Sequence, residues 1–542
     1  MQTSAVADRE VNQSSKTLLT WCGKQYWLAI LPALPILITY FFYPNFLDNE
    51  AGKLIEARRI LQPAFLGHDW LQAGSSEDVL YRAFSSLIAP LWWVFKDAIL
   101  VALAGRLLIW ALLLYALLRL ARALEIQGYA LAIGLAIWLL RAQSQGAGEW
   151  IFGGIEGKGV AYALLFLAME AALRKRVLAS ALYCGLAIWF HVLVGGWGAM
   201  ALGGALLLCH RDYGWRCPLQ FGAITGAFLL PLVVEYVRNT GMGESGGSSA
   251  EANRLIVLFR NPHHLDPWFF HGKYEFALLC FLAAVTSYAL FRLVSRSKAA
   301  LISCFLGLLL LQFGAGLAAR RMEAFWFLKN YPFRVADVLV ALLFWMTVPM
   351  LAVWISEWIS KQVIFSRWPA RFLVLAWSAL LAASAMVVVV KSLPLAEQNF
   401  AVFAGSWSRW LRHDESPWRE ATQWIRLRTP ASAVIIAPPW EGAFWIEAER
   451  AELVNFKRAP HSRAILEWQR RMIDLNGGPF HSRGFGALDE LQEHYPQLDA
   501  AKVEALGRSY GADYFLTMRP LSEMAGGLVY QNGSYFLYQL KR

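Results

Sequence analysis

Long, nearly uninterrupted runs of apolar residues recur along most of this chain, and they limit what it can fold into. Of its 542 residues, 57% are hydrophobic and only 16% are charged, which lies outside the usual composition of soluble proteins. A helix needs roughly 17 to 25 apolar residues to cross the hydrocarbon core of a bilayer. The sequence therefore predicts an α-helical polytopic membrane protein. About eleven segments approach the required length, at residues 26–43, 98–118, 127–141, 159–173, 178–194, 195–209, 219–237, 274–291, 299–317, 335–356 and 372–390.

The distribution of Lys and Arg predicts the orientation of these spans. Short loops that retain Lys and Arg lie on the cytoplasmic side of a membrane. Here the basic residues fall in every second loop and before the first span, at residues 16–24, 119–122, 174–176, 211–216, 292–298 and 361–371. We therefore expect a cytoplasmic N-terminus and an external C-terminal region. The same alternation places four other loops outside, at residues 44–97, 142–158, 238–273 and 318–334.

The charge and the cysteines exclude other classes of protein. The net charge of +11 comes from basic residues that are spread over many loops rather than gathered on one face, so we expect no nucleic-acid partner. The six cysteines lie within spans or near their ends, without the spacing of metal ligands, and are expected to be small buried hydrophobes rather than disulfides. The first span lacks a following cleavage site and is expected to be a retained signal anchor.

The last third of the chain has a different composition, with mixed charge and segments bounded by proline. We expect a transmembrane domain over residues 1–391 and a soluble external α/β domain over residues 392–542. Ser416 followed by Pro417 is typical of a helix start, and Asn532 followed by Gly533 between apolar runs predicts a β-hairpin. Strands are also predicted at residues 433–437, 453–456 and 514–517, and a helix at residues 462–472.

Carboxylates in the first external loop are the leading candidates for chemistry. Asp48 and Glu50 are separated by one residue, a spacing that can present two carboxylates to a divalent cation or to a sugar hydroxyl. Asp69, beside Trp70, is a third candidate. The plainer alternative is that these side chains are merely solvated, with Trp70 at the membrane interface.

Cations near the ends of later spans are candidates for binding a lipid phosphate. Lys158 follows a glycine-rich stretch just before a span, and Glu156, two residues earlier, is placed to bind another group. Arg106 lies inside the second span, where a charge needs a partner or a bound anion. Arg334 is expected at headgroup depth, where Lys158 and Arg334 can clamp a phosphate together. The alternatives are a snorkelling lysine, a structural ion pair and simple interfacial anchoring.

Two adjacent histidines, His263 and His264, occupy the third external loop. Their side chains point different ways in an extended chain, so each can supply one ligand or one acid or base. A zinc site is not expected, because the usual spaced ligands are absent. We expect at least one of the two histidines to contact the substrate.

Together these features resemble the GT-C superfamily of membrane glycosyltransferases, and more narrowly a bacterial group within it. The superfamily shares the cytoplasmic N-terminus, the acidic first external loop, about eleven spans and the external C-terminal domain. The narrower likeness is carried by residues 57–70, 153–158, 260–267, 331–334 and 444–468. In GT-C enzymes an acidic residue of the first external loop acts as the base or helps to hold a metal. The resemblance therefore implies Asp48 as the base and Glu50 as its partner, although the motif here is Asp-Asn-Glu rather than two aspartates, and Asp69 is the alternative.

The predicted function is a glycosyltransferase of the bacterial inner membrane. The resemblance implies a polyprenyl-phosphate or polyprenyl-diphosphate sugar donor in the bilayer and a glycan, lipid or protein acceptor on the external face. Any cofactor would be a divalent cation, Mg²⁺ or Mn²⁺, at Asp48 and Glu50. One rival is a transporter or flippase of lipid-linked glycans, which the absence of internal repeats disfavours. The other is a non-catalytic assembly protein of an envelope polysaccharide system.

Overall fold

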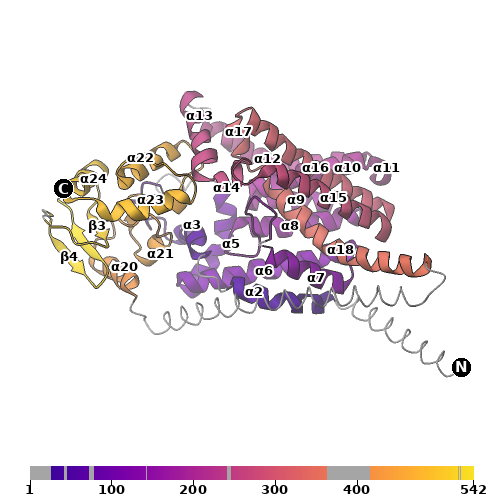
Figure 1. Ribbon diagram of the computed structural model, residues 1–542, viewed down its shortest axis with the longest axis horizontal. Coiled ribbons are helices and arrows are strands. Elements are labelled where there is room, and N and C mark those ends of the chain that lie inside the picture. Colours follow the sequence, from indigo (N-terminus) through magenta and orange to yellow (C-terminus); the bar gives the residue numbers. More distant parts are fainter. Residues whose placement is uncertain are drawn as a thin grey trace, which may run out of the picture.

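A helical body carries a smaller α/β domain at one end (Figure 1). The computed structural model describes residues 26–41, 46–71, 79–141, 143–240, 246–362, 416–522, 524 and 526–541. The predicted eleventh span at residues 372–390 and the predicted domain boundary at residue 391 lie outside these ranges. So does the side chain of Asp48.

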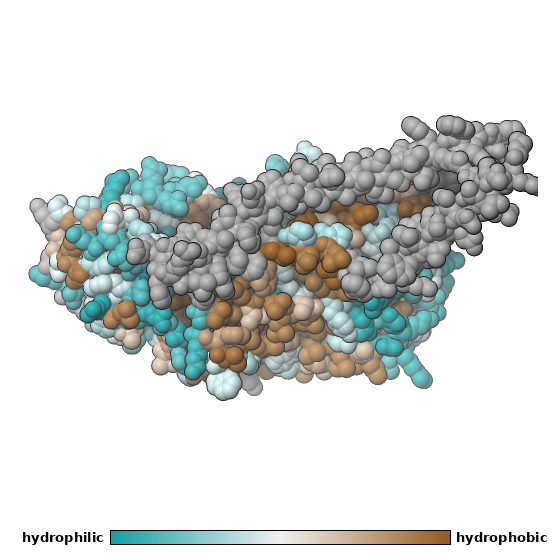
Figure 2. Space-filling view, turned by 90° about the horizontal axis from the view of Figure 1, so that it is seen from below, coloured by the Kyte–Doolittle hydropathy of each residue, from teal (hydrophilic) through white to brown (hydrophobic). Residues whose placement is uncertain are grey.

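The predicted membrane helices form at the expected places, but their number is not established. Five described helices are long and apolar enough to cross a membrane. They are α6 (Ala98–Ala123), α12 (Arg216–Thr240), α15 (Gly272–Leu293), α16 (Arg296–Arg321) and α18 (Arg334–Gln362). Four others, also at predicted positions, are shorter: α7 (Gly128–Leu140), α8 (Gly157–Leu173), α9 (Val177–Phe190) and α10 (Val192–Leu208). Apolar residues gather on the middle of the visible face of this body, whereas its far end and most of the α/β domain are hydrophilic (Figure 2).

Helix α8 lies at the centre of the body, and every residue from Gly157 to Leu173 is buried. It packs against α6 and α9. Small residues allow this close packing, as is usual between membrane helices. A Cβ at Gly157 would overlap the backbone carbonyl oxygen of Phe190. This contact places the start of α8, which carries Lys158, against the end of α9.

The first predicted span and the loop after it differ from expectation. The span is divided into a 3-10 helix, η1 (Tyr26–Ala33), and a short helix, α2 (Leu34–Phe41), since Pro32 and Pro35 cannot donate backbone hydrogen bonds. The region predicted as an external loop contains two helices that pack together, α3 (Phe46–Leu61) and α5 (Val79–Phe95). Each buries one face at helical spacing, and the indole of Trp92 on α5 donates to the carbonyl of Leu54 on α3 at 2.8 Å.

The C-terminal domain is built on a five-stranded sheet in the order β2-β1-β3-β5-β4. Strand β1 is parallel to β2 and β3, whereas β5 is antiparallel to β3 and β4. The strands are β1 (Val434–Ile436), β2 (Ala451–Glu452), β3 (Tyr514–Thr517), β4 (Leu528–Gln531) and β5 (Phe536–Gln539). The helices are α20 (Pro417–Arg428), α21 (Phe444–Glu447), η3 (Phe456–Arg458), α22 (Ala464–Asn476), α23 (Gly486–His494), η4 (Tyr495–Gln497) and α24 (Ala500–Tyr510).

Most predicted elements of this domain are confirmed, and one is wrong. The helix starting at Pro417, the strand at 514–517 and the hairpin around Asn532 form as expected. The strand predicted at residues 453–456 does not form. Strand β2 ends at Glu452, just before this segment, and η3 begins at Phe456. The strand does not continue because the side chain of Asn455 accepts a hydrogen bond from the amide of Lys457 at 2.9 Å and caps a 3-10 turn.

The domain docks on the helical body through polar contacts and buried side chains. Arg58 of α3 pairs with Glu449 at 2.7 Å, and Arg260 donates to the carbonyl of Phe456 at 2.9 Å. The amide of Gly484 donates to the carbonyl of Phe259 at 2.7 Å. Two further helices, α13 (Gly246–Leu255) and α14 (Pro262–Leu265), lie in the loop that makes the last two of these contacts, with a π-helical turn, η2 (Ile256–Arg260), between them. The loops at this end of the body therefore lie against the C-terminal domain. The short helices α11 (His210–Tyr213) and α17 (Phe325–Leu328) lie between longer helices of the body.

Candidate functional site

The site is organised by the irregular segment between α7 and α8, whose backbone is held by buried side chains. Gln143 accepts hydrogen bonds from the amides of Ile151 and Phe152 at 2.9 and 2.7 Å. Asp337 of α18 accepts three, from residues 145, 146 and 147, at 2.8 to 3.0 Å. Because buried amides need partners, these side chains fix a segment that has no regular secondary structure of its own.

This segment carries Glu149, which brings two cations together. Lys158 Nζ lies 2.8 Å from Glu149 Oε1, and Arg334 Nε lies 2.5 Å from Glu149 Oε2. The three side chains are only 8%, 11% and 2% exposed for Lys158, Arg334 and Glu149. Glu156 also pairs with Lys158, at 3.1 Å. The predicted meeting of Lys158 and Arg334 is thus seen in the structure, around a carboxylate that the sequence did not single out.

The cluster is held by charge more than by well-directed hydrogen bonds. Glu149 Oε1 and Arg334 Nε are buried without a contact of hydrogen-bond geometry, although both lie within ion-pair distance of a partner. Burial alone would raise the pKa of the Glu149 carboxyl, but Arg334 and Lys158 outweigh it and lower the pKa to about 2. Glu149 is therefore ionised at neutral pH. The ammonium of Lys158 also lies 3.6 Å from the ring centre of Trp150, a cation–π contact.

Two histidines and a tyrosine border the cluster. The amide of Val194 donates to His191 Nδ1 at 3.2 Å, so the neutral ring carries its proton on Nε2. Arg334 Nη1 lies 3.3 Å from this Nε2, but a guanidinium can only donate, so in this tautomer the contact is not a hydrogen bond. His264 Nδ1 lies 2.5 Å from the carbonyl oxygen of Ala147, which can only accept, so His264 carries its proton on Nδ1. The guanidinium of Arg334 stacks at 3.9 Å over the ring of Tyr331.

The C-terminal domain contributes His461 to the same region. Its ring centre lies 6.1 Å from that of Tyr331. The side chain has exposed surface, yet protein surrounds it closely enough that burial lowers the pKa of its imidazole. Nearby cations lower this pKa further, namely Arg260, Arg334, Lys329 and Lys53. Cations from α3, from two loops and from the start of α18 thus converge beside the Glu149 cluster.

The buried histidines predict that acid destabilises the fold. Burial is the main cause that lowers the pKa of His263 to about 2 and that of His264 to about 4. A group whose pKa falls on folding contributes stability that is complete above its unfolded value of 6.5 and is lost as pH falls below it. The melting temperature should therefore fall from pH 7 to pH 5. In the variant His263→Phe, the new ring can pack on Phe485 as His263 does, and the number of protons taken up on unfolding should fall by about one. An unchanged dependence of stability on pH would contradict the assignment.

Glu50 and Arg106, predicted as a catalytic carboxylate and an anion site, are partners of each other. Arg106 Nε and Nη2 donate to the two oxygens of Glu50 at 2.7 and 2.6 Å, and both side chains are almost completely buried, at 3% and 0% exposed. The amide of Ile155 also donates to Glu50, at 2.6 Å. A metal ion or a substrate anion would have to break this pair. The arrangement gives Glu50 and Arg106 a structural task, which is to fix α3 to α6 and to the Glu149 segment.

The other three predicted residues, Asp69, His263 and Asp48, lie in different places. Asp69 is buried and accepts from the amides of Leu71 and Glu452 at 3.0 and 3.3 Å, so it lies where the loop after α3 meets the C-terminal domain. His263 packs between His264 and Phe485, next to the cluster. Asp48 lies on the first turn of α3, one turn before Gly52.

Glu149 was missed because nothing near it in sequence marks it. It is a single acid in a segment without periodicity, nine residues before Lys158 and far from Arg334. It could have been found only by an electrostatic argument, because two cations at the ends of membrane spans need an acidic partner nearby. Among the residues that the structure describes, no group of three or more His, Cys, Asp or Glu side chains is placed to hold a metal ion.

Comparisons with known proteins give a short family match and distant structural neighbours. Residues 416–475, in the C-terminal domain, match a family described as a domain of unknown function, DUF6798. No curated protein matches the chain. The chain is similar to the oligosaccharyltransferase of Archaeoglobus fulgidus, at 12% identity over 91% of this chain and 70% of that one, with a TM-score of 0.45. It is also similar to ArnT from Cupriavidus metallidurans, solved with undecaprenyl phosphate, at 9% identity over 95% of this chain and 98% of that one, with a TM-score of 0.45. Both are GT-C glycosyltransferases, the superfamily that the sequence resembles.

Proposed function

We propose that this protein transfers a sugar from a polyprenyl-phosphate-linked donor to an acceptor on the external face of the bacterial inner membrane. One observation carries the proposal, the convergence of Lys158 and Arg334 at the ends of two helices of the membrane body. A lysine and an arginine that share a site are suited to hold a phosphate. The resemblance to GT-C enzymes supplies the class of reaction.

The reaction needs a base and a group that stabilises the leaving phosphate. Asp48 accepts the proton of the acceptor hydroxyl while that oxygen attacks the anomeric carbon of the donor sugar. The bond between the anomeric carbon and the phosphate oxygen breaks with inversion, and the lipid phosphate leaves with the bonding electrons. Lys158, Arg334 and the Nε2 proton of His191 stabilise its added charge.

Glu149 prepares the two cations without blocking them. An ammonium has three donors and a guanidinium has five, and the recorded pairing with Glu149 uses one contact of each. The carboxylate therefore lowers the electrostatic cost of holding two like charges close together, and an incoming phosphate would bind through other donors of the same two side chains. The Glu50–Arg106 pair positions α3, and with it Asp48, against the segment that carries Glu149.

The orientation belongs to the same proposal. The basic loops place the N-terminus in the cytoplasm, and the C-terminal domain then lies outside, next to the cluster through His461. There it would bind the acceptor or close the site.

The experiment uses the purified full-length protein in lipid nanodiscs, with polyprenyl-phosphate hexoses and polyprenyl-diphosphate hexoses labelled in the sugar. Label should move from lipid to a water-soluble or lipid acceptor in a cell-envelope extract, with release of free polyprenyl phosphate from the phosphate donors and of polyprenyl diphosphate from the diphosphate donors. In vesicles, unchanged donor that crosses to the other leaflet would instead identify a flippase. A protein that binds envelope glycan but neither consumes nor moves the donor would be the assembly protein, and either result overturns the proposal.

A further inference from the structure

The C-terminal domain has a pocket of its own at the ends of the central strands of its sheet. The pocket has a volume of about 320 Å³ and is lined by Pro430, Ser432, Ala433, Asp513, Tyr514, Gln539 and Leu540. These residues lie at the beginnings of β1 and β3 and at the end of β5, three neighbouring central strands whose ends meet on one side of the sheet. The domain meets the helical body through Glu449, which precedes β2, and through Glu452 and Phe456, which lie at and beyond its end. None of the residues that line the pocket belongs to the Glu149 cluster, so the pocket is a separate site.

The walls of the pocket are fixed by the backbone of the sheet. Asp513 accepts from the amide of Val434 at 3.0 Å through its side chain. Its own amide donates to the carbonyl of Val434 at 2.8 Å, and its carbonyl accepts from the amide of Leu540 at 2.8 Å. These bonds join all three segments that line the pocket. A pocket held in this way is formed before any ligand binds, as is usual for small-molecule sites.

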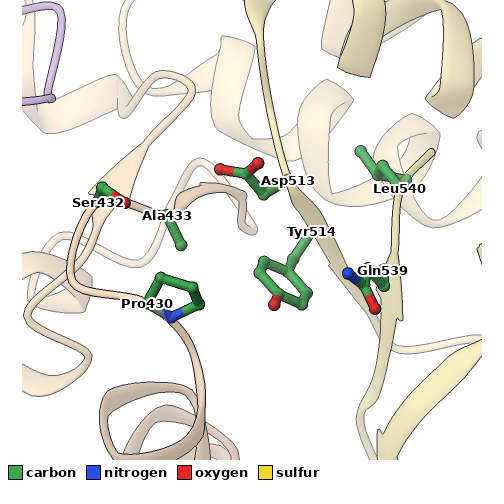
Figure 3. Close-up of a pocket in the computed structure, with 7 residues that line it drawn as sticks. All are labelled: Pro430, Ser432, Ala433, Asp513, Tyr514, Gln539 and Leu540. Atoms are coloured by element: carbon green, nitrogen blue, oxygen red, sulfur yellow. The ribbon is translucent and has the colours of Figure 1, made fainter. Parts of the chain in front are cut away.

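The side chains in the pocket point to one class of ligand. Tyr514 and Gln539 are direct cross-strand partners, so they lie side by side on one face of the sheet. Figure 3 shows the Tyr514 ring between Pro430 and Gln539, with the Asp513 carboxylate nearer to Ser432. An aromatic ring can cover the apolar face of a sugar ring, while a carboxylate, an amide and a hydroxyl can accept from and donate to its hydroxyl groups.

The charge of the pocket further restricts the class of ligand that it can bind. Its seven lining residues include one carboxylate and no basic side chain. A phosphate or an acidic sugar would be repelled by Asp513 and would find no cation to pair with. The volume lies near the lower end of the usual range for small-molecule pockets, about 300 to 1,000 Å³. A single sugar ring of a longer glycan suits this size better than a lipid or a nucleotide.

We infer that the pocket formed by Asp513, Tyr514, Gln539 and Ser432 binds one neutral sugar unit of a glycan. As a binding site, the pocket is independent of transfer chemistry. Its identification as an anchor for the acceptor rests on the proposed function. The acceptor would then be a glycan chain long enough to occupy this pocket and the Glu149 cluster together, so that one of its sugars is held while its end reacts.

Saturation-transfer NMR on the full-length protein in nanodiscs tests this inference. The probes are the methyl glycosides of glucose, galactose and N-acetylglucosamine, with methyl glucuronide as the acidic comparison. At least one neutral glycoside should give a signal and bind at least about fivefold more weakly to Gln539→Ala, which loses hydrogen bonds to the sugar. Tyr514→Phe should retain binding because the ring remains. Gln531→Ala, an exposed glutamine on the neighbouring strand β4, is the matched control and should bind as the wild type does.

Three results would overturn the inference: no signal from any neutral glycoside, equal binding of the glucuronide, or equal losses in Gln539→Ala and Gln531→Ala. The test does not depend on catalysis. Glycoside binding that Gln539→Ala weakens, in a protein that never consumes a donor, would leave the pocket in place and refute only the transferase.

Discussion

Asp48→Asn should lower the rate of sugar transfer by about 10²- to 10⁴-fold, the usual contribution of a general base, with almost no change in thermal unfolding. Asparagine has nearly the same shape but cannot take the proton of the acceptor hydroxyl. Asp48 lies in the first turn of α3, where the loss of a negative charge costs only about 0.3 to 1 kcal/mol through the helix dipole. The rate is measured with the labelled donor at saturating acceptor, and the melting temperature on the same preparation.

Glu50→Gln is the comparison for this prediction, because it changes the other acid of the motif. It leaves the Arg106 guanidinium buried without its counter-charge, which should destabilise the fold by about 3 to 5 kcal/mol. Adding Arg106→Gln removes the uncompensated charge and should restore much of that loss, as a double-mutant cycle would show. Full transfer by Asp48→Asn would remove Asp48 as the base and make Asp69→Asn the next variant to test. Loss of transfer at an unchanged melting temperature in Glu50→Gln would make Glu50 itself catalytic.

The hydrophobic pattern was sufficient to locate most of the membrane body, since burial in lipid requires long apolar helices whatever their partners. It did not locate α3, whose apolar residues occupy only one face and are interrupted by Lys53, Glu56 and Arg58. In the C-terminal domain, turn chemistry at Asn532 predicted the hairpin correctly. Asn455 misled the prediction of the second strand, because a capping side chain and an extended strand residue look alike in sequence.

The candidate site shows a different limit of sequence analysis. Lys158 and Arg334 could be chosen individually, since a charge at the end of a span calls for an explanation. Their shared partner Glu149 could not, and neither could the pairing of Glu50 with Arg106, 56 residues apart. Ion pairs of this kind depend on how helices pack in three dimensions, and a single sequence contains no direct record of that packing. The same reason explains why His461, in a separate domain, was not assigned to the site.

Lys158→Gln and Arg334→Gln should each weaken the binding of polyprenyl phosphate by roughly 10- to 150-fold, because a charge-assisted hydrogen bond contributes about 1.5 to 3 kcal/mol. Binding is measured at equilibrium with a fluorescent polyprenyl phosphate in nanodiscs. Lys298→Gln is the matched control, since Lys298 also forms an ion pair, with Glu125 at 2.6 Å, but lies at the start of α16, in a region predicted to be cytoplasmic. It should bind the lipid as the wild type does.

Glu149→Gln separates an anion site from an ion cluster that only stabilises the fold. Glu149 is the counter-charge that a lipid phosphate must compete with, so its neutralisation should tighten phosphate binding even while it lowers the melting temperature. A structural cluster gives a different pattern, since loss of any one of Glu149, Lys158 or Arg334 would then lower stability and change lipid binding in the same direction. Lys158 and Arg334 each lie within 3 Å of Glu149. Loss of either cation can weaken phosphate binding while loss of Glu149 strengthens it only if the phosphate takes part of the place that Glu149 occupies. Weaker lipid binding by Glu149→Gln would therefore exclude Lys158 and Arg334 as the phosphate clamp, and the proposed leaving-group site would have to be sought among Arg260, Lys329 and Lys53.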